Sequence, residues 1–470
     1  MNSKRWLILI LALGVLLRAV PAVLLGDSVV ELPGTADQLS YHTLAVRVLE
    51  GHGFSMPAQW WPVTAAGAPT AHWSFLYTFY LWAVYGLFGV HPLIVRLLQA
   101  VAAGVLMPWL AYRIGKRAFG KAGDRGQGAG VELPALLAGA WVAVYPYFLY
   151  YAASLMTETF YITAILWSLD AALRIGKKSD EQGAGDRGQG IKLWLELGLA
   201  LGITVLLRQV FLPFVPFLLL WLLLVTVKPL AGLKVKGFKV SRPKPGATQP
   251  ANRLTFNQFI WRAALALAIL AALIAPFTIY NYARFERFVL LNTNAGYAFF
   301  WSNHPVHGDK FVPLFTPEMP TYQELIPKEL RQLDEAALER ALMERGLQFV
   351  LDDPLRFLKL SFSRIPEHFI FWPKTDSGLI SNLTRVSSIG LALPFMLAGG
   401  WLWFRAVRRK QLNWAPGSLL VLFMLVYVGM HLVSWAGIRY RLPTDATGLL
   451  FAAYTFSMLL KSFAKLFHQD

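Results

Sequence analysis

The sequence contains no cysteine. Disulfide bonds, thiolate metal ligands and cysteine nucleophiles are therefore excluded from its chemistry. Acidic side chains are also few: 27 Asp and Glu stand against 44 Lys and Arg in 470 residues, which gives a net charge of +17. No recognised nucleic-acid-binding fold and no platform of interleaved aromatic and basic residues accompanies this charge. We therefore predict no nucleic-acid partner.

What the chain has in abundance is long apolar runs. Hydrophobic residues make up 56% of it, 17 residues are Trp, and the mean hydropathy is +0.46, a composition too apolar for an ordinary soluble protein. A membrane span needs about 20 mostly apolar residues. The sequence thus predicts an all-α polytopic membrane protein with ten spans, at 5–25, 93–113, 133–151, 158–175, 193–208, 210–227, 260–281, 388–404, 416–435 and 444–461.

The first span begins with Lys4 and Arg5, as a signal peptide does. Its apolar run is long and no small-residue cleavage site follows, so we expect a retained anchor. An even number of spans returns both termini to one side of the membrane.

Basic residues follow alternate spans, in clusters at 113–121, 174–178, 228–262 and 405–410; the third carries eight Lys and Arg and no acid. Basic loops stay on the cytoplasmic side, where they also attract anionic membrane lipid. We therefore expect a protein of the inner (cytoplasmic) membrane with both termini cytoplasmic. The opposite loops hold most acids and histidines, which places the active site on the outer face.

Two cytoplasmic loops share the heptapeptide AGDRGQG, at 122–128 and 184–190. Its glycines indicate a flexible linker, because a phosphate cradle would need a preceding strand and a following helix start. The stretch 236–252, rich in Pro, Lys and Gly, is likewise predicted to be a disordered loop.

Two outer segments complete the organisation. In 26–92 we predict a helix near 36–50, and an aromatic-rich stretch, 73–89, which is short for a span and favours a helix lying flat at the outer interface. The segment 282–387 carries 13 acids and 12 bases. We expect it to cap the membrane domain with helices at 333–350 and 354–370. The second of these has Asp353 as N-cap and Pro354 at its first position. The chain thus divides into a transmembrane module (1–281), this cap, and C-terminal transmembrane helices (388–470).

Two outer-face acids are candidates for chemistry. Asp37 begins the helical stretch 36–50, so it serves either as an N-cap or as a general base, with Tyr41 and His42 one turn on, lining the same face. Glu158 stands at the outer mouth of the fourth span, where acids tend to face water or a partner. An ordinary interfacial acid is the alternative there.

Four arginines near the outer face are candidates for holding a phosphate, since the guanidinium fork makes bidentate contacts. Arg18 and Arg208 lie near the ends of spans and can equally snorkel to the surface. Arg439 and Arg441 flank Tyr440 between the last two spans. They oppose the positive-inside bias, so an anionic partner is expected there.

A further cluster runs from Asn294 to Asn303 and His304. Its turn-forming residues can be purely structural, but its amide and ring donors also suit a sugar or phosphate.

A resemblance rests on the order of these motifs. The outer Asp and Tyr are followed by EGHGFS at 50–55, LFGVHPLIVRLLQ at 87–99 and YPYFLYYAASLMTE at 145–158. TNAGY at 293–297, SNHP at 302–305 and RYRLP at 439–443 complete the set. Nearly end to end, the chain resembles bacterial membrane glycosyltransferases of the GT-C superfamily, related to dolichyl-phosphate-mannose protein mannosyltransferases and aminoarabinose transferases.

The resemblance implies a polyprenyl-phosphate sugar donor, a catalytic base at Asp37 and a second acidic position at Glu158. It further implies basic residues for the lipid phosphate, matched by Arg439 or Arg441 and less closely by Arg208. The chain departs from the family where His72-Trp73-Ser74-Phe75 replaces a basic-Pro-Pro run, and where Gln38 follows the first acid.

The predicted reaction is therefore inverting transfer of a sugar to an acceptor hydroxyl of a lipid, glycan or protein. Asp37 would accept the proton, and Arg441, Arg439 and His72 would hold the leaving phosphate. Glu158 would orient these groups or help to bind a divalent metal, although no His/Cys ligand spacing supports a metal site.

Three rival functions stay open. A flippase or transporter would show related halves or broken helices near mid-membrane, and no such repeat is visible. A non-catalytic scaffold would tolerate loss of Asp37. A polysaccharide polymerase or ligase would share the donor and differ in what is transferred.

Overall fold

The computed structural model describes residues 3–59, 64–120, 129–180, 187–227, 253–312, 319–375 and 377–466. Most of the repeated heptapeptide segments and the loop 236–252 fall outside these ranges. Within them the fold is all-helical, with only isolated bridge pairs and no strand.

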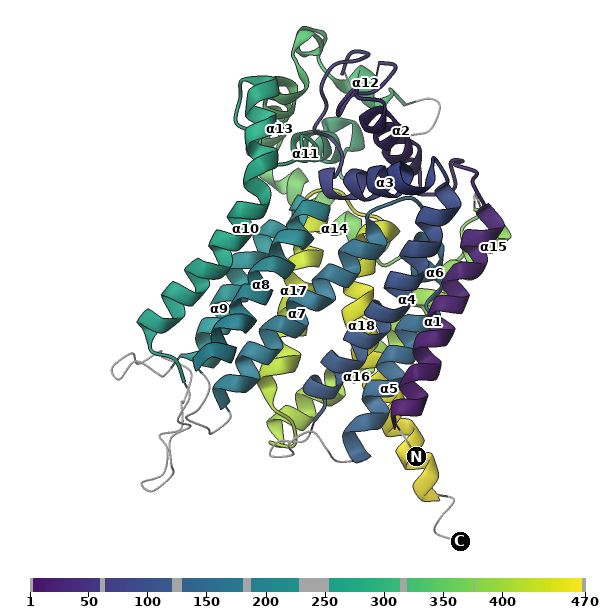
Figure 1. Cartoon of the computed structure of the whole chain (residues 1–470), viewed down its shortest axis with the longest axis vertical. Helices are drawn as coiled ribbons and strands as arrows, with labels where there is room; N and C mark the ends of the chain where they lie inside the picture. Colours follow the sequence, from purple (N-terminus) through teal and green to yellow (C-terminus); the bar gives the residue numbers. More distant parts are fainter. Residues whose placement is uncertain are drawn as a thin grey trace.

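Long helices stand side by side and form the membrane bundle (Figure 1). They are α1 (Ser3–Leu25), α4 (Pro92–Ala118), α5 (Ala129–Val144), α6 (Pro146–Ala152), α7 (Glu158–Asp180), α8 (Arg187–Leu207), the short η1 (Gln209–Phe214) leading into α9 (Val215–Thr226), α10 (Phe256–Phe285), α16 (Leu391–Arg408), α17 (Trp414–Val433) and α18 (Ile438–Leu466).

Every predicted span falls on these helices. In the described residues, eight helices are long and apolar enough to cross a membrane, and α5 with α6, bent by 51°, makes a ninth. The tenth predicted span is α7, which stands within the bundle (Figure 1) but carries Asp170 and Arg174. The fold class is confirmed, whereas apolarity alone supports nine spans.

The cap lies over one end of the bundle (Figure 1). It comprises α2 (Asp37–Leu49), α3 (Phe75–Phe88), α11 (Ala295–Asn303), α12 (Tyr322–Leu325), α13 (Glu335–Asp352), α14 (Pro354–His368) and α15 (Leu379–Arg385). Helix α3 lies across the bundle axis, as the aromatic stretch predicted. Ser74 caps its first turn by accepting from the backbone N–H of Tyr77. Asp353 caps α14 in the same way, as expected from the sequence.

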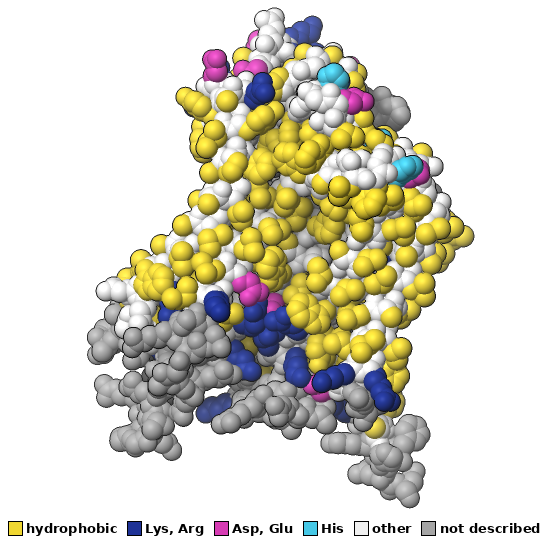
Figure 2. Space-filling model, in the orientation of Figure 1, with side chains coloured by type: hydrophobic (Ala, Val, Ile, Leu, Met, Phe, Trp, Pro, Cys, Tyr) yellow, Lys and Arg dark blue, Asp and Glu magenta, His cyan; other side chains and the backbone are white. Residues whose placement is uncertain are grey.

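The start of α1 and the end of α18 lie at the end of the bundle opposite the cap (Figure 1). Most of the Lys and Arg side chains in view gather toward that end, with a few acids among them, while histidines, acids and a few basic side chains appear near the cap (Figure 2). The alternation of basic loops read from the sequence therefore corresponds to a separation of charge in space.

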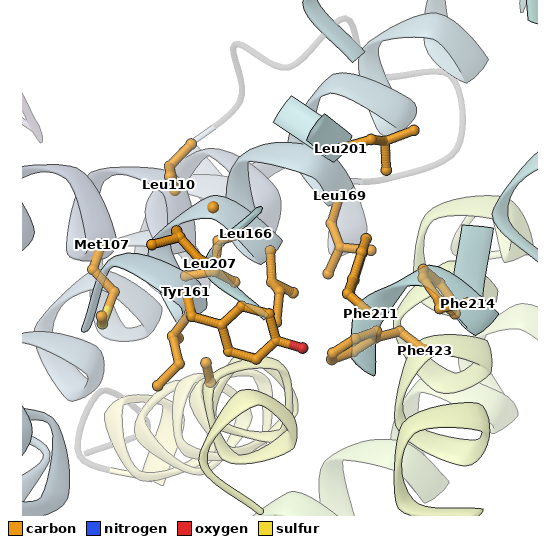
Figure 3. Close-up of a cluster of buried hydrophobic side chains, with 14 of the residues drawn as sticks. Met107, Leu110, Tyr161, Leu166, Leu169, Leu201, Leu207, Phe211, Phe214 and Phe423 are labelled. Atoms are coloured by element: carbon orange, nitrogen blue, oxygen red, sulfur yellow. The ribbon is translucent and has the colours of Figure 1, made fainter. Parts of the chain in front are cut away.

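The bundle is held together by a continuous apolar core. At its centre the ring of Tyr161 lies among aliphatic and aromatic side chains from several helices (Figure 3). They include Met107, Leu110, Leu166, Leu169, Leu201, Leu207, Phe211, Phe214 and Phe423. This packing fixes the helix ends on which the polar residues sit.

Candidate active site

Two carboxylates and two guanidinium groups from distant parts of the chain meet where the bundle joins the cap. Arg439 Nη2 lies 2.6 Å from Oδ2 of Asp37, and its Nε lies 2.6 Å from Oε1 of Glu158. Arg208 Nη2 lies 2.5 Å from the same Glu158 oxygen. The four groups form one row of alternating charge, here called the charge row, whose formal charges cancel.

Each member of the charge row stands at the end of a helical element. Asp37 and Glu158 are the first residues of α2 and α7, Arg439 is in the first turn of α18, and Arg208 separates α8 from η1. Helix N-termini carry partial positive charge and favour carboxylates. The bundle therefore brings to one place groups that lie between 50 and 402 residues apart in the sequence.

Asp37 does not act as an N-cap. The cap position of α2 is Ala36, and no side chain caps the helix there. The Asp37 side chain, 32% exposed, turns to Arg439 instead. Of the two interpretations that the sequence left open, the capping one is wrong.

A cavity of about 710 Å³ adjoins the charge row, between the bundle and the cap. Three members of the row line it, and Glu158, only 2% exposed, lies behind them. Predicted residues on its wall are Asp37, Tyr41, His72, Arg208, Asn294, Arg439 and Tyr440.

The cap side of the cavity is built from two loops tied to each other. Asn292 Nδ2 donates to the carbonyls of Ala71 (3.0 Å) and Trp73 (2.7 Å), and Asn294 Nδ2 donates to that of His72 (3.1 Å). Gln209 joins this set by donating to the Asn294 side chain (3.1 Å). Asn294 thus both lines the cavity and holds His72 in place.

Two glutamates of α13 fasten the same loops from behind. Glu335 accepts from Thr64 Oγ1 (2.5 Å), the Ala71 amide (2.8 Å) and Thr293 Oγ1. One turn on, Glu339 accepts from the amide of Gly296 (2.7 Å) at the start of α11. The two carboxylates supply the hydrogen-bond acceptors that these hydroxyl and amide groups need when they are buried.

Protonation states follow from this geometry. Burial opposes ionisation of Asp37, but the guanidinium of Arg439 outweighs it, so the pKa of Asp37 is lower than usual. Burial also lowers the pKa of His72, despite the nearby carboxylates of Glu335 and Asp37. His72 lines the cavity, and its lowered pKa favours the neutral ring, which can donate or accept a hydrogen bond; its expected contact with the lipid phosphate stays a prediction.

The structure does not bring Arg441 to the cavity. Its Nε lies 3.0 Å from Oδ1 of Asp445, one turn along α18, and its Nη1 donates to the carbonyl of His368 (3.0 Å). Asp445 in turn accepts from the hydroxyl of Tyr145 (2.7 Å). The side chain of Arg441 is fully buried in this network, so the expectation that it meets Asp37 and Glu158 is wrong; Arg439 takes that position.

Three further candidates also lie away from the cavity wall. His42 Nδ1 pairs with the hydroxyl of Tyr85 (2.8 Å). Asn303 donates to the carbonyl of Phe299 (2.9 Å), and His304 Nδ1 accepts from the amide of Val306 (3.1 Å). The structure thus does not bring these three side chains to the cavity, and their predicted binding roles stay predictions.

Arg18 is likewise structural. It is completely buried and donates to the carbonyls of Val142 (3.1 Å) and Ala143 (2.9 Å) at the end of α5. It neither snorkels to the surface nor reaches the cavity.

Several cavity residues escaped the sequence analysis. They are Gln209, Asn292, Tyr322, His431 and Trp435. Only Gln209 carried a signal, because it adjoins Arg208; the others come from loops and helix ends whose meeting no spacing reveals.

A metal ion does not fit the residues present. Among the described residues there is no group of three or more His, Cys, Asp or Glu side chains placed to hold one. Both carboxylates of the charge row pair with guanidinium groups. In this arrangement another anion can take the place of a carboxylate beside an arginine.

No family model and no curated protein matches the sequence. The archaeal oligosaccharyltransferase AglB from Archaeoglobus fulgidus, solved with an inhibitory peptide and a dolichol-phosphate, matches with a TM-score of 0.58 and 14% identity over 99% of this chain and 52% of that one. The apo form of the Archaeoglobus fulgidus oligosaccharyltransferase gives 0.57, also at 14% identity, over 98% and 51%. ArnT from Cupriavidus metallidurans with undecaprenyl phosphate gives 0.41 at 13% identity over 97% and 79%, too low to support an argument.

This chain therefore shares the fold of the archaeal oligosaccharyltransferase, and it spans about half the length of that enzyme.

Proposed function

We propose that this protein transfers a sugar from a polyprenyl-phosphate-linked donor to an acceptor hydroxyl at the outer face of the cytoplasmic membrane. The observation that carries the proposal is the charge row beside the cavity. It presents a carboxylate and two arginines to one space large enough for a sugar phosphate.

The arginines supply the donor site. Arg208 and Arg439 line the cavity, and their present partners are carboxylates. A phosphate is the same kind of acceptor and accepts bidentate guanidinium contacts. As the sugar–phosphate bond breaks, negative charge grows on the phosphate, and arginines already in place stabilise it.

Asp37 supplies the base. Its pKa is low while Arg439 faces it. Once Arg439 turns to a donor phosphate, that stabilisation weakens and the carboxylate becomes a better proton acceptor. Asp37 then takes the acceptor's proton as its oxygen attacks the anomeric carbon, and the phosphate leaves from the opposite side, so the centre inverts.

Topology and fold both favour a lipid-carried donor. Nucleotide sugars are cytosolic, whereas the start of α1, the end of α18 and most of the Lys and Arg side chains in view lie opposite the cavity (Figures 1 and 2). The fold is shared with an oligosaccharyltransferase solved with a dolichol-phosphate. Whether the acceptor is a lipid, a glycan or a protein is to be tested by supplying candidates of each class.

The test is transfer by the purified protein from a panel of labelled polyprenyl-phosphate sugars, with the native chain beside Asp37→Asn. We expect Asp37→Asn to lower the rate about 10²–10⁴-fold, the usual contribution of a general base. Asp27→Asn is the matched control, because Asp27 is an exposed aspartate near the cap that pairs with His91 and lies outside the charge row.

Undiminished transfer by Asp37→Asn would overturn the assignment of the base. No transfer from any lipid donor, by a chain that moves labelled lipid between leaflets of a vesicle, would identify a flippase instead.

A further inference from the structure

A second hollow lies below α3 and between α4, α7 and α8, and it shares Leu207 with the cavity beside the charge row. It has a volume of about 480 Å³, and none of the side chains that line it is charged. The two tyrosines near its α3 end use their hydroxyls elsewhere: Tyr77 donates to Gln99 (3.0 Å) and Tyr80 to the carbonyl of Val95 (2.8 Å). We call this hollow the apolar groove.

A cluster of charge lies just beyond the other end of the groove. Asp170, whose side chain is fully buried, pairs with Arg113 (2.9 Å), Arg174 (3.0 Å) and Arg117. Arg174 also pairs with Glu196. Three bases thus meet two acids, and each arginine side chain keeps about a fifth of its surface exposed.

The groove and the cluster are joined by two tryptophans. Trp109 and Trp167 line the groove. The Arg113 guanidinium lies 4.3 Å from the centroid of the Trp109 ring, and Trp167 Nε1 donates to Glu196 (2.8 Å).

We propose that the groove and the cluster together bind one anionic phospholipid from the leaflet on the side of the chain termini. An acyl chain would lie in the groove against Trp109 and Trp167. The lipid phosphate would accept from Arg113 and Arg174 and neutralise the excess positive charge.

The distribution of charge selects this occupant over a lipid from the other leaflet. A lipid entering from the α3 end would find tyrosine hydroxyls already engaged and no cation along the groove. The only charged groups next to the groove's tryptophans that the described residues provide are those of the cluster, at the end opposite α3. The groove shares Leu207 with the cavity beside the charge row, but the cluster that would hold the phosphate lies at the groove's other end, and the proposal does not depend on the proposed transfer.

The chain offers a matched control. Arg408 also lies over an aromatic ring, that of Phe404, at 5.8 Å near the end of α16, and it is exposed. It has the same chemistry as Arg113 on Trp109 but no adjoining groove. If a basic side chain on an aromatic ring were enough, Arg408 would bind lipid equally well.

The experiment is native mass spectrometry of the full chain in detergent, titrated with phosphatidylglycerol or with phosphatidylcholine of the same acyl chains. We expect one tightly held phosphatidylglycerol per chain and no comparable phosphatidylcholine. Arg113→Gln should weaken the complex about tenfold, the effect of losing one charge-assisted hydrogen bond. Leu106→Trp, which fills the groove from a partly exposed position, should weaken it as well, and Arg408→Gln should leave it unchanged.

Equal retention of both lipids, or binding that neither Arg113→Gln nor Leu106→Trp alters, would overturn the proposal. Binding of undecaprenyl phosphate that falls with Leu106→Trp but not with Arg113→Gln would assign the groove to a lipid of the other leaflet. Thermal midpoints of all variants show whether each chain is folded when it is titrated.

Discussion

Two sets of arginines in this protein differ in what they donate to. Arg18, Arg96 and Arg364 are fully buried and donate to backbone carbonyls, for example Arg96 to Ala153 (2.8 Å) and Arg364 to Leu432 (2.9 Å). In the charge row, Arg208 and Arg439 pair with carboxylates, and their side chains are 15% and 21% exposed.

The difference separates structural from functional arginine. Several of the carbonyls in the first group lie at the ends of helices, where the last turn lacks partners within the helix. Such an arginine donates to the end of a helix, and its side chain is buried away from solvent. An arginine held by a carboxylate next to a cavity can change partners, because a phosphate offers the same kind of acceptor.

Arg439→Gln is the strongest test of this comparison. We expect the transfer rate to fall about 10³-fold, as when a charge-stabilising donor is removed from an active site. The thermal midpoint should stay close to that of the native chain, because Glu158 keeps Arg208 and Asp37 is partly exposed. A midpoint that falls together with the rate would place Arg439 with the structural arginines.

Asp445→Asn tests the opposite case. The change leaves the fully buried Arg441 without its ion-pair partner, and an uncompensated buried charge should lower the free energy of unfolding by about 3 kcal/mol. Thermal denaturation in detergent measures the loss, and the transfer rate per folded molecule should change little.

The control is the double variant Asp445→Leu with Arg441→Met. It removes both charges and should recover much of the stability. A transfer rate that drops in Asp445→Asn while the thermal midpoint holds would return Arg441 to the active site.

The fold could be predicted from the sequence because an apolar run or a basic loop is recognised from its own residues alone. Each span is read from its own residues, and the aromatic content of 73–89 identified α3 without reference to any other helix. Asp37 and Glu158 were found for the same reason, since each acid stands at the outer end of an element.

The sequence did not predict which residues reach the cavity where a side chain had more than one possible partner. Arg439 and Arg441 are two residues apart and look equivalent. Asp445, four residues after Arg441 on one helix, was the available sign that Arg441 had a local partner. No comparable sign marked Asn292 or His431, because they reach the cavity only through contacts between loops and helices that are distant in sequence.

The same comparison applies to acidic side chains, and Glu339 gives the smallest of the predicted effects on stability or activity. Its carboxylate accepts hydrogen bonds from the backbone amides of Gly296 and Tyr297, just as the structural arginines donate to backbone carbonyls. Glu158, by contrast, pairs with arginines. Burial raises the pKa of Glu339 to about 7, even though these amides favour the ionised form. The folded protein therefore holds the proton more tightly than the unfolded chain. The stability gained from it is full below the unfolded pKa of about 4.5 and is lost as the pH rises through about 7.

Between about pH 5.5 and about pH 8 the free energy of unfolding should accordingly fall by about 2 kcal/mol from this group. Thermal midpoints measured across this range should decline in the native chain and decline less in Glu339→Gln, which keeps the shape of the side chain without its charge. Glu344→Gln is the matched control, since Glu344 lies on the same helix, exposed and paired with Arg340. If the decline persists in Glu339→Gln, the amides hold the ionised carboxylate more strongly than burial opposes it. Glu339 would then be a charged anchor of the cavity loops, like Glu158 in the charge row.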